Sequence, residues 1–274
     1  MRFGCCGSMI SPATDPVGVE IVEKLAAFGF DYIELSLAHI AEMEEESFRH
    51  LADRVAKSGL RCEACNNFFP PRVRLTGPDA SLPRAHEYAR RAIERAGRLG
   101  AKIIVFGSSG AKNVPPGFPH DRAWRQIVEL LRTIGPLAAR HGVTIAIEPL
   151  NRQESNIVNL ASEGLRLARE VDHPNVQLLV DFYHFRKEDE PFEVLGEAGS
   201  AIRHTHFAEL QARAFPTEEQ EGYGRFFECL HRIRYDGRCS IEAYTQDFVT
   251  DAPKALANLR RIAGRCDAGR QADQ

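Results

Sequence analysis

The feature that most constrains the fold of this chain is a repeated change from helical to strand-like sequence. At each change a glycine ends an amphipathic stretch and a short apolar run follows, at Gly29, Gly59, Gly100, Gly142 and Gly237. Glycine suits the end of a helix because it lacks the Cβ that clashes in the left-handed conformation. Strands that alternate with helices in this way predict a parallel sheet.

Eight apolar runs have the length and composition of strands. They begin near Phe3, Tyr32, Cys62, Ile103, Ile145, Gln177, Ile202 and Ser240. Their continuous apolar character is typical of strands that helices cover from outside. Eight alternating units in 274 residues favour one α/β domain, a closed (β/α)8 or TIM barrel, over an open sheet. No Gly-x-Gly-x-x-Gly follows the first run, which counts against a dinucleotide-binding fold.

Local signals predict the limits of some helices. Ser81 is placed to cap a helix that ends before Gly100, and Asp15-Pro16 resembles the start of the first helix. Pro136 should kink or shorten the helix in which it lies. No linker divides the chain, so we expect residues 1–266 to form the barrel and the polar residues 267–274 to form a C-terminal tail.

Bulk properties narrow the functional classes. The net charge of −3 gives no electrostatic attraction to nucleic acid. No apolar run approaches the ~20 residues of a membrane-spanning helix, and the first six residues lack the apolar region of a signal peptide. Seven scattered cysteines suit reduced thiols. We therefore expect a cytoplasmic protein with neither a nucleic-acid nor a membrane partner.

Cys62 and Cys65 have the CxxC spacing of redox motifs. A redox pair normally opens a helix, whereas these two lie in an apolar run that predicts a strand. Residues three apart in a strand point to opposite faces. The sequence therefore predicts two structural thiols that face away from each other.

Four side chains with metal-binding groups come directly after apolar strand cores: Glu148, Asp181, His206 and Glu242. The carboxyl ends of barrel strands form the face on which active sites lie, so the four should converge. Three carboxylates brought together repel one another and resist ionisation, and a divalent cation removes that penalty. Oxygen-rich ligation with one imidazole and no thiolate favours Mn²⁺, Mg²⁺ or Co²⁺ over a structural zinc.

The alternative for each residue is a structural role. A single carboxylate at a strand end is usually a solvated rim residue or an ion-pair partner, but four metal-binding side chains at matching strand ends favour a site. His204 shares a strand face with His206, so either a core or a site position stays open for it. His206 is the preferred ligand because it lies nearer the carboxyl end.

Four segments carry a resemblance to a known family: Ile147-Glu148-Pro149-Leu150-Asn151-Arg152, Asp181-Phe182-Tyr183-His184, His204-Thr205-His206-Phe207-Ala208-Glu209 and Ile241-Glu242. They resemble the sugar-phosphate isomerase/epimerase superfamily, the xylose isomerase-like barrel group. Within it they are similar to D-tagatose 3-epimerase and hydroxypyruvate isomerase-type proteins. The resemblance covers essentially the whole barrel, with its specific motifs between Glu148 and Glu242.

The resemblance implies a metal-dependent isomerase or epimerase of a small keto-sugar or hydroxy-carbonyl compound. It implies one Mn²⁺-type ion, with Mg²⁺ or Co²⁺ as alternatives, held by the four residues above. Glu148 and Glu242 would exchange the substrate proton from opposite faces through a metal-stabilised enediolate. His184, Arg213 and Glu154 fall where the family places contacts to its polyhydroxy carbonyl substrates. A homodimer or homotetramer is also expected from the resemblance.

Two regions depart from the family or extend the site. After Arg213 the family usually has a compact Pro-Gly-x-Gly turn, but this chain has an acidic stretch over residues 214–224. It puts the substrate in question and leaves Arg213 as either a substrate contact or a solvated loop arginine. The segment Asn66–Pro70, with Asn67 as a substrate contact, could form a second wall, although its aromatic residues suit a core as well.

Three other functions stay open. An inosose dehydratase-type lyase could use the same metal and base to remove a β-hydroxyl group as water. An endonuclease IV-like nuclease shares this barrel, but its multi-metal cluster needs histidines from earlier strands that Asn66-Asn67 and Gly107-Ser108-Ser109 do not supply. A non-catalytic sugar-binding protein is the third, because a fold alone does not define a function.

Overall fold

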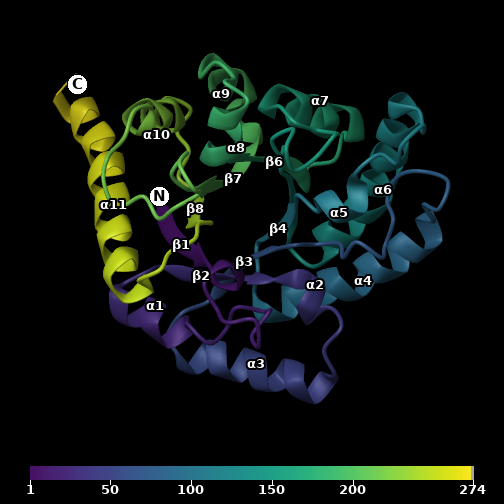
Figure 1. Cartoon of the computed structure of the whole chain (residues 1–274), viewed down its shortest axis with the longest axis horizontal. Helices are drawn as coiled ribbons and strands as arrows, with labels where there is room; N and C mark the ends of the chain where they lie inside the picture. Colours follow the sequence, from purple (N-terminus) through teal and green to yellow (C-terminus); the bar gives the residue numbers. More distant parts are fainter. Residues whose placement is uncertain (273–274) are drawn as a thin grey trace.

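The chain forms a closed parallel barrel of eight strands that pair in chain order, with the last strand beside the first (Figure 1). The computed structural model describes the backbone of residues 1–272 and the side chains of residues 1–266. The strands are β1 (Arg2–Cys6), β2 (Tyr32–Ser36), β3 (Cys62–Asn66), β4 (Ile103–Phe106), β5 (Thr144–Ile147), β6 (Val176–Asp181), β7 (Ile202–Phe207) and β8 (Arg238–Ile241). The predicted single (β/α)8 domain is confirmed.

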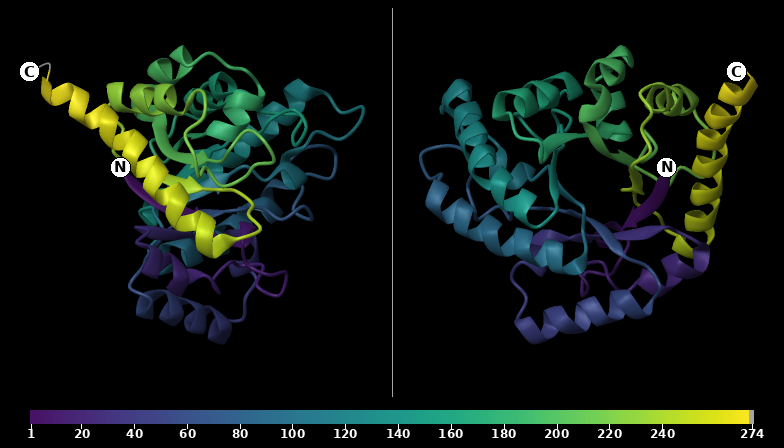
Figure 2. Two further views of the ribbon diagram at one scale, coloured as in Figure 1. Left: turned by 60° about the vertical axis from the view of Figure 1, so that its left-hand side comes forward. Right: turned by 180° about the vertical axis from the view of Figure 1, so that it is seen from behind.

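Helices surround the barrel on its outside (Figure 2). They are α1 (Val22–Phe28), α2 (Leu37–Ile40), α3 (Glu45–Lys57), α4 (Leu82–Leu99), α5 (Ser109–Lys112), α6 (His120–Arg140), α7 (Ala161–Val171), α8 (Phe182–Lys187), α9 (Glu193–Ala198), α10 (Tyr223–Arg232) and α11 (Phe248–Ala272), with the 3-10 helices η1 (Gly7–Met9) and η2 (Gly199–Ala201). None of the described helices has the length and apolar character needed to cross a membrane. The side chains of the predicted tail 267–274 lie outside the described residues.

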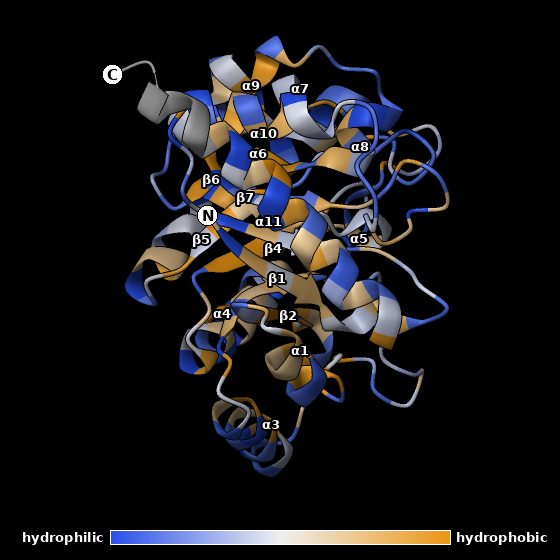
Figure 3. Ribbon diagram, turned by 90° about the vertical axis from the view of Figure 1, so that its left-hand side faces the viewer, coloured by the Kyte–Doolittle hydropathy of each residue, from blue (hydrophilic) through white to orange (hydrophobic). Residues whose placement is uncertain are grey.

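The hydrophobic core has two parts, one inside the barrel and one between the barrel and its helices. The interior cluster consists of Tyr32, Ala64, Ile103, Val105, Ala146 and Leu179. Its largest member depends on a glycine, because a Cβ at Gly4 would lie only 2.3 Å from the Tyr32 ring. In Figure 3 the hydrophobic colours gather on the central strands and the hydrophilic colours on the surrounding helices and loops.

One predicted helix limit is confirmed, because the Ser81 hydroxyl caps α4 and accepts the Arg84 N–H at 3.4 Å. Two others, at Pro136 and at Asp15, differ from the predictions. Helix α6 is not shortened by Pro136 but continues to Arg140. A proline removes one helical hydrogen bond, and the buried apolar face of α6 packs on both sides of it, which maintains the helix.

The first helix begins at Val22 and not at Asp15. The Asp15 carboxylate instead shapes the preceding loop, because it accepts the backbone N–H groups of Gly18 at 3.0 Å and Glu20 at 2.7 Å. An aspartate that binds nearby backbone N–H groups produces the same sequence signal in a loop as at a helix start.

The prediction that Cys62 and Cys65 face apart is wrong, because their Sγ atoms lie 3.7 Å from each other. Pairing of β2 with β3 places Ile33 opposite Cys62 but the next residue opposite Ala64. Glu63 is therefore an extra residue, a bulge that resets the alternation of side chains. Both thiols are free and buried, as a structural role requires.

Candidate metal centre

The four predicted metal ligands converge at the carboxyl end of the barrel. Glu148 follows β5, Asp181 ends β6, His206 lies in β7 and Glu242 follows β8. One oxygen or nitrogen atom from each lies within 4.8 Å of those from the other three, and all four side chains are buried. The strand ends thus bring together residues that are far apart in sequence.

The backbone continues the barrel ladder past the strand ends, and this fixes the two glutamates. The Glu148 N–H donates to the Phe106 carbonyl at 3.2 Å, and the Glu242 N–H donates to the Phe207 carbonyl at 3.1 Å. A Cβ at Gly107 would lie 2.2 Å from Glu148 Oε2. The glycine after β4 is therefore what leaves room for this carboxylate.

His206 is the central group of the cluster. Its Nδ1 lies 2.9 Å from Glu148 Oε1 and 3.3 Å from Glu242 Oε2. Asp181 adds a third carboxylate, whose Oδ2 is 3.4 Å from Arg213 Nη2. Three carboxylates and one imidazole nitrogen, buried and close together, form a donor set that fits a hard or borderline divalent cation.

The ionisation of these groups reflects crowding of negative charge. Burial, together with repulsion from Glu242, raises the pKa of Glu148, and burial raises the pKa of Asp181 to about 7. Burial also disfavours the charged form of Glu242, but attraction to His206 and Arg213 holds its pKa well below its usual range. Without a metal, the carboxylates take their positive charge from Arg213 and from His206. Although burial opposes it, attraction to Glu242 and the other carboxylates raises the pKa of His206 well above its ordinary value.

His184, a predicted substrate contact, lies beside the cluster with one nitrogen turned toward it. Its Nδ1 is 2.8 Å from the side-chain amide nitrogen of Asn151, so Nδ1 accepts a hydrogen bond and Nε2 carries the proton. Burial lowers the pKa of His184 to about 3, which keeps the ring neutral. Among the described residues Nε2 has no hydrogen-bond partner, and it lies 3.5 Å from Asp181 Oδ2. The ring therefore offers an unused N–H donor at the centre.

Arg213 and Glu154 also lie at the centre. The Arg213 side chain is only 14% exposed and forms an ion pair with Glu242, so it is not a solvated loop arginine. Glu154 Oε2 is 3.5 Å from Arg213 Nη1, and the Glu154 side chain is 37% exposed at the rim. The guanidinium lies over the ring of Tyr183, 5.0 Å from its centroid.

Asn67 is the remaining predicted substrate contact. It is exposed, and its amide is 3.5 Å from the Ser36 hydroxyl. Its neighbour Asn66 points the other way and donates to Glu242 Oε1 at 3.0 Å. Asn66 is therefore the residue of this segment that contacts the centre.

The acidic stretch after Arg213 packs against the last helix. Glu219 forms ion pairs with Arg261 and Arg265 of α11. Phe215 is buried and lies near Phe248 at the start of the same helix. The charge of Glu219 is therefore neutralised away from the centre.

Two buried charged residues near the centre were not predicted. Glu34 Oε1 lies 3.0 Å from Nε2 of His206, and its other oxygen binds His204 at 2.9 Å. Lys112 donates to the main-chain carbonyl of Glu148 at 3.1 Å. Glu34 could have been recognised as a buried charge from the sequence, because it interrupts the apolar run of β2. The sequence around Lys112 carried no comparable signal, because the burial of Lys112 depends on how α5 packs.

The chain matches the family model described as a xylose isomerase-like TIM barrel over residues 22–263. It is 24% identical over 271 residues to a ketose 3-epimerase of Arthrobacter globiformis, covering 96% of this chain and 90% of the relative. It is 29% identical over 201 residues to a 2-oxo-tetronate isomerase of Pectobacterium atrosepticum, covering 70% and 75%.

The fold is also similar to solved structures. A D-psicose 3-epimerase determined in the presence of D-fructose has a TM-score of 0.85 at 22% identity, covering 96% of this chain and 100% of the other. An L-ribulose 3-epimerase has a TM-score of 0.85 at 21% identity, covering 100% and 98%. With the family model matched over nearly the whole barrel, the resemblance in the four segments is confirmed, and the chain belongs to the xylose isomerase-like TIM barrel family.

Proposed function

We propose that this protein is a divalent-metal-dependent isomerase or epimerase that acts on a small keto-sugar or hydroxy-carbonyl compound. The observation that carries the proposal is the buried cluster of Glu148, Asp181, His206 and Glu242, with ligand atoms within 4.8 Å of one another. Mn²⁺ is the proposed ion, with Mg²⁺ or Co²⁺ as alternatives, because the donors are mostly oxygen. A cytoplasmic homodimer or homotetramer remains part of the proposal.

The relatives support a sugar isomerase or epimerase. They include ketose, D-psicose and L-ribulose 3-epimerases and a 2-oxo-tetronate isomerase. Reactions of this kind need a group that removes a proton beside a carbonyl and a group that returns it. Glu148 and Glu242 are the two carboxylates available for both steps, since they flank the same nitrogen of His206.

Different residues of the chain can carry out different steps of this reaction. One glutamate removes the proton from the carbon beside the carbonyl, leaving an enediolate, and the other returns a proton from the opposite face or to the neighbouring carbon. Nε2–H of His184 and the guanidinium of Arg213 can donate to the developing oxyanion or to hydroxyl groups of the substrate. A divalent ion bound by the four residues would supply Lewis acidity and offset the carboxylate charge.

The alternatives are less well supported. A dehydratase-type lyase could begin with the same proton removal, but the curated relatives named above are epimerases and isomerases. A multi-metal nuclease would need histidines from the earlier strands, but Asn66 and Asn67 stand at the end of β3 and Gly107, Ser108 and Ser109 follow β4. A non-catalytic binding protein would not need two glutamates beside one imidazole.

The proposal is tested by proton exchange. Metal-stripped protein, with and without Mg²⁺, is incubated in D2O with ketoses, 2-oxo-tetronate, hydroxypyruvate, inososes and their phosphates, and the products are followed by NMR. We expect metal-dependent deuterium uptake beside the carbonyl, lost in Glu148→Gln and retained in the surface variant Glu197→Gln, which lies exposed on α9.

The product then identifies the reaction. An inverted carbon indicates epimerisation, a moved carbonyl indicates isomerisation, and loss of water indicates the lyase. Saturable sugar binding without any deuterium uptake, in protein shown to bind the metal, would refute the catalytic proposal.

A further inference from the structure

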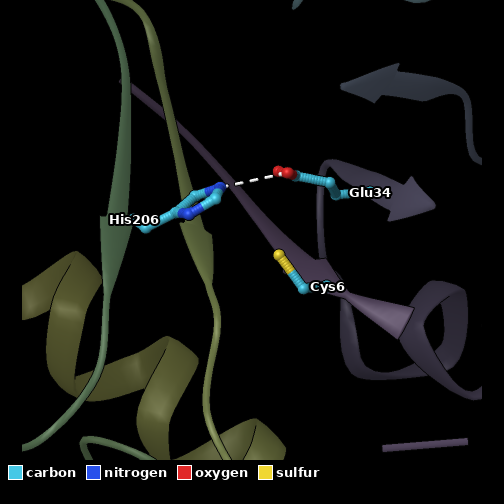
Figure 4. A group of neighbouring side chains, drawn as sticks. All are labelled: Cys6, Glu34 and His206. Atoms are coloured by element: carbon cyan, nitrogen blue, oxygen red, sulfur yellow. Dashed lines mark hydrogen bonds and ion pairs between the residues drawn. The ribbon is translucent and has the colours of Figure 1, made fainter. Parts of the chain in front are cut away.

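The buried carboxylate of Glu34 has no part in the reaction proposed above, yet it lies directly behind His206. Figure 4 shows the imidazole of His206 joined to Glu34 across the inside of the barrel, with the thiol of Cys6 beside them. The His206 Nε2 to Glu34 Oε1 distance is 3.0 Å, and neither side chain is exposed. A fully buried carboxylate is costly unless it is paired and hydrogen-bonded, so its position calls for an explanation.

We infer that Glu34 is a positioning residue, which holds His206 with its Nε2–H toward Glu34 and its Nδ1 free to bind a metal ion at the four-residue centre. The inference rests on the proposed function, because it assigns Glu34 a role toward the metal. An ionised carboxylate only accepts hydrogen bonds, so the nitrogen that faces Glu34 must carry the proton. In a neutral ring the lone pair then lies on Nδ1, the nitrogen that faces Glu148 and Glu242.

Glu34 is itself held in one orientation. Its Oε2 accepts a hydrogen bond from the Ser240 hydroxyl at 2.6 Å and lies 2.9 Å from Nε2 of His204. The Tyr32 hydroxyl lies 2.7 Å from the Ser240 oxygen and completes the chain of bonds. These side chains are all fully buried. A metal-binding histidine whose other N–H meets a fixed carboxylate has a defined tautomer and ring orientation, and it is a more basic ligand.

A second metal site at Cys6, Glu34 and His206 is the competing explanation, since their ligand atoms also lie within 4.8 Å of one another. It would require His206 to bind one ion through each nitrogen, and therefore to give up both ring protons. The hydrogen bonds from Ser240 and His204 already occupy one oxygen of Glu34. The geometry therefore favours a hydrogen-bonded support over a second ion.

The test measures binding of Co²⁺ alone to EDTA-stripped protein, by visible absorption and chelator competition. We expect one Co²⁺ per wild-type chain and an affinity about 10- to 100-fold weaker in Glu34→Gln. Glu190→Gln is the matched control, because it makes the same change in another buried glutamate, which accepts the backbone N–H groups of Ala161 and Ser162 and does not touch His206. It should lower the melting temperature slightly and leave the Co²⁺ affinity unchanged.

The outcomes separate this inference from the proposed function. Equal Co²⁺ affinity in wild type and Glu34→Gln would overturn the inference alone, and so would two ions per wild-type chain. Absence of Co²⁺ binding to the wild type would overturn the proposed function as well.

A measurement on the wild type covers the case in which Glu34→Gln does not fold. In Zn²⁺-loaded protein with nitrogen-15-labelled histidine, the proton of His206 should be found on Nε2 and the metal on Nδ1. The reverse assignment would refute the inference.

Discussion

Replacement of Asp181 by asparagine should make the metal-free protein more stable, and the gain should grow with pH. Asp181 is 2% exposed, and burial raises its pKa from 3.8 to about 7 despite the opposing attraction of Arg213. Since this pKa is higher in the fold than in the unfolded chain, the carboxyl group costs the fold nothing below pH 3.8. The cost grows as the pH rises toward 7.

The size of the effect follows from the two pKa values. Each tenfold change in proton affinity corresponds to about 1.4 kcal/mol. The difference between the pKa of 3.8 in the unfolded chain and about 7 in the fold therefore limits the destabilisation by ionised Asp181 to about 4 kcal/mol above neutral pH. Asparagine is nearly isosteric and can still accept the Tyr183 N–H, which Asp181 binds at 2.8 Å. Between about pH 5 and about pH 8 the advantage of the variant should increase by about 2 to 3 kcal/mol.

Urea unfolding in EDTA across this pH range measures the difference between the two proteins. Asp247→Asn is the matched control, because Asp247 also accepts an N–H at the start of a helix, from Thr250 at 3.2 Å, but is exposed. It should show no such increase. A gain for Asp181→Asn that is absent, or that does not change with pH, would refute the reasoning. With saturating Mn²⁺ the order should reverse, because only the wild type keeps all four ligands.

Two further predictions concern the packing and charge around the centre. Phe207→Leu should lower the free energy of unfolding by about 1 to 2 kcal/mol, because this buried ring stacks on Phe182 with centroids 4.5 Å apart. Urea unfolding measures this loss beside that of the control Tyr244→Leu, whose side chain is 53% exposed. Equal losses of unfolding free energy in the two variants would contradict the prediction. Burial lowers the pKa of Lys112 from 10.5 to about 8, so the stability of the wild type relative to Lys112→Met should rise between these pH values. Parallel pH profiles would contradict this prediction.

The sequence predicted the parts of the centre that follow from strand ends alone. In a parallel barrel all carboxyl ends lie on one face, so Glu148, Asp181, His206 and Glu242 could be grouped without knowledge of pairing. For these four side chains to converge, the strands that carry them need only lie side by side in chain order. The structure supplies that order, since each strand pairs with the next one along the chain.

Features that depend on register could not be predicted in this way. Cys62 and Cys65 share a face only because a bulge at Glu63 interrupts the alternation of side chains. For the same kind of reason, the contact of Asn66 with Glu242 could not be predicted, because it depends on the orientation at the end of β3. An extended backbone continues to Asn66, whereas Asn67 takes a positive φ of 50° and turns away. Single-residue shifts of this kind move a side chain from one face to the other.

The contacts behind the centre join parts of the barrel that are not neighbours in the sheet. Glu34 on β2 reaches His206 on β7, and Asn66 at the end of β3 reaches Glu242 after β8. Around the closed barrel, β8 and β1 lie between the first two partners, and β1 and β2 lie between the second two, so both contacts exist only when the barrel closes. The residues predicted to bind the metal all follow from β5 to β8, but those that orient them come from β2 and β3. Closure of the barrel is therefore what turns a row of strand-end ligands into a centre of defined geometry, and a disturbance at the β8–β1 junction should weaken metal binding even though it touches no ligand.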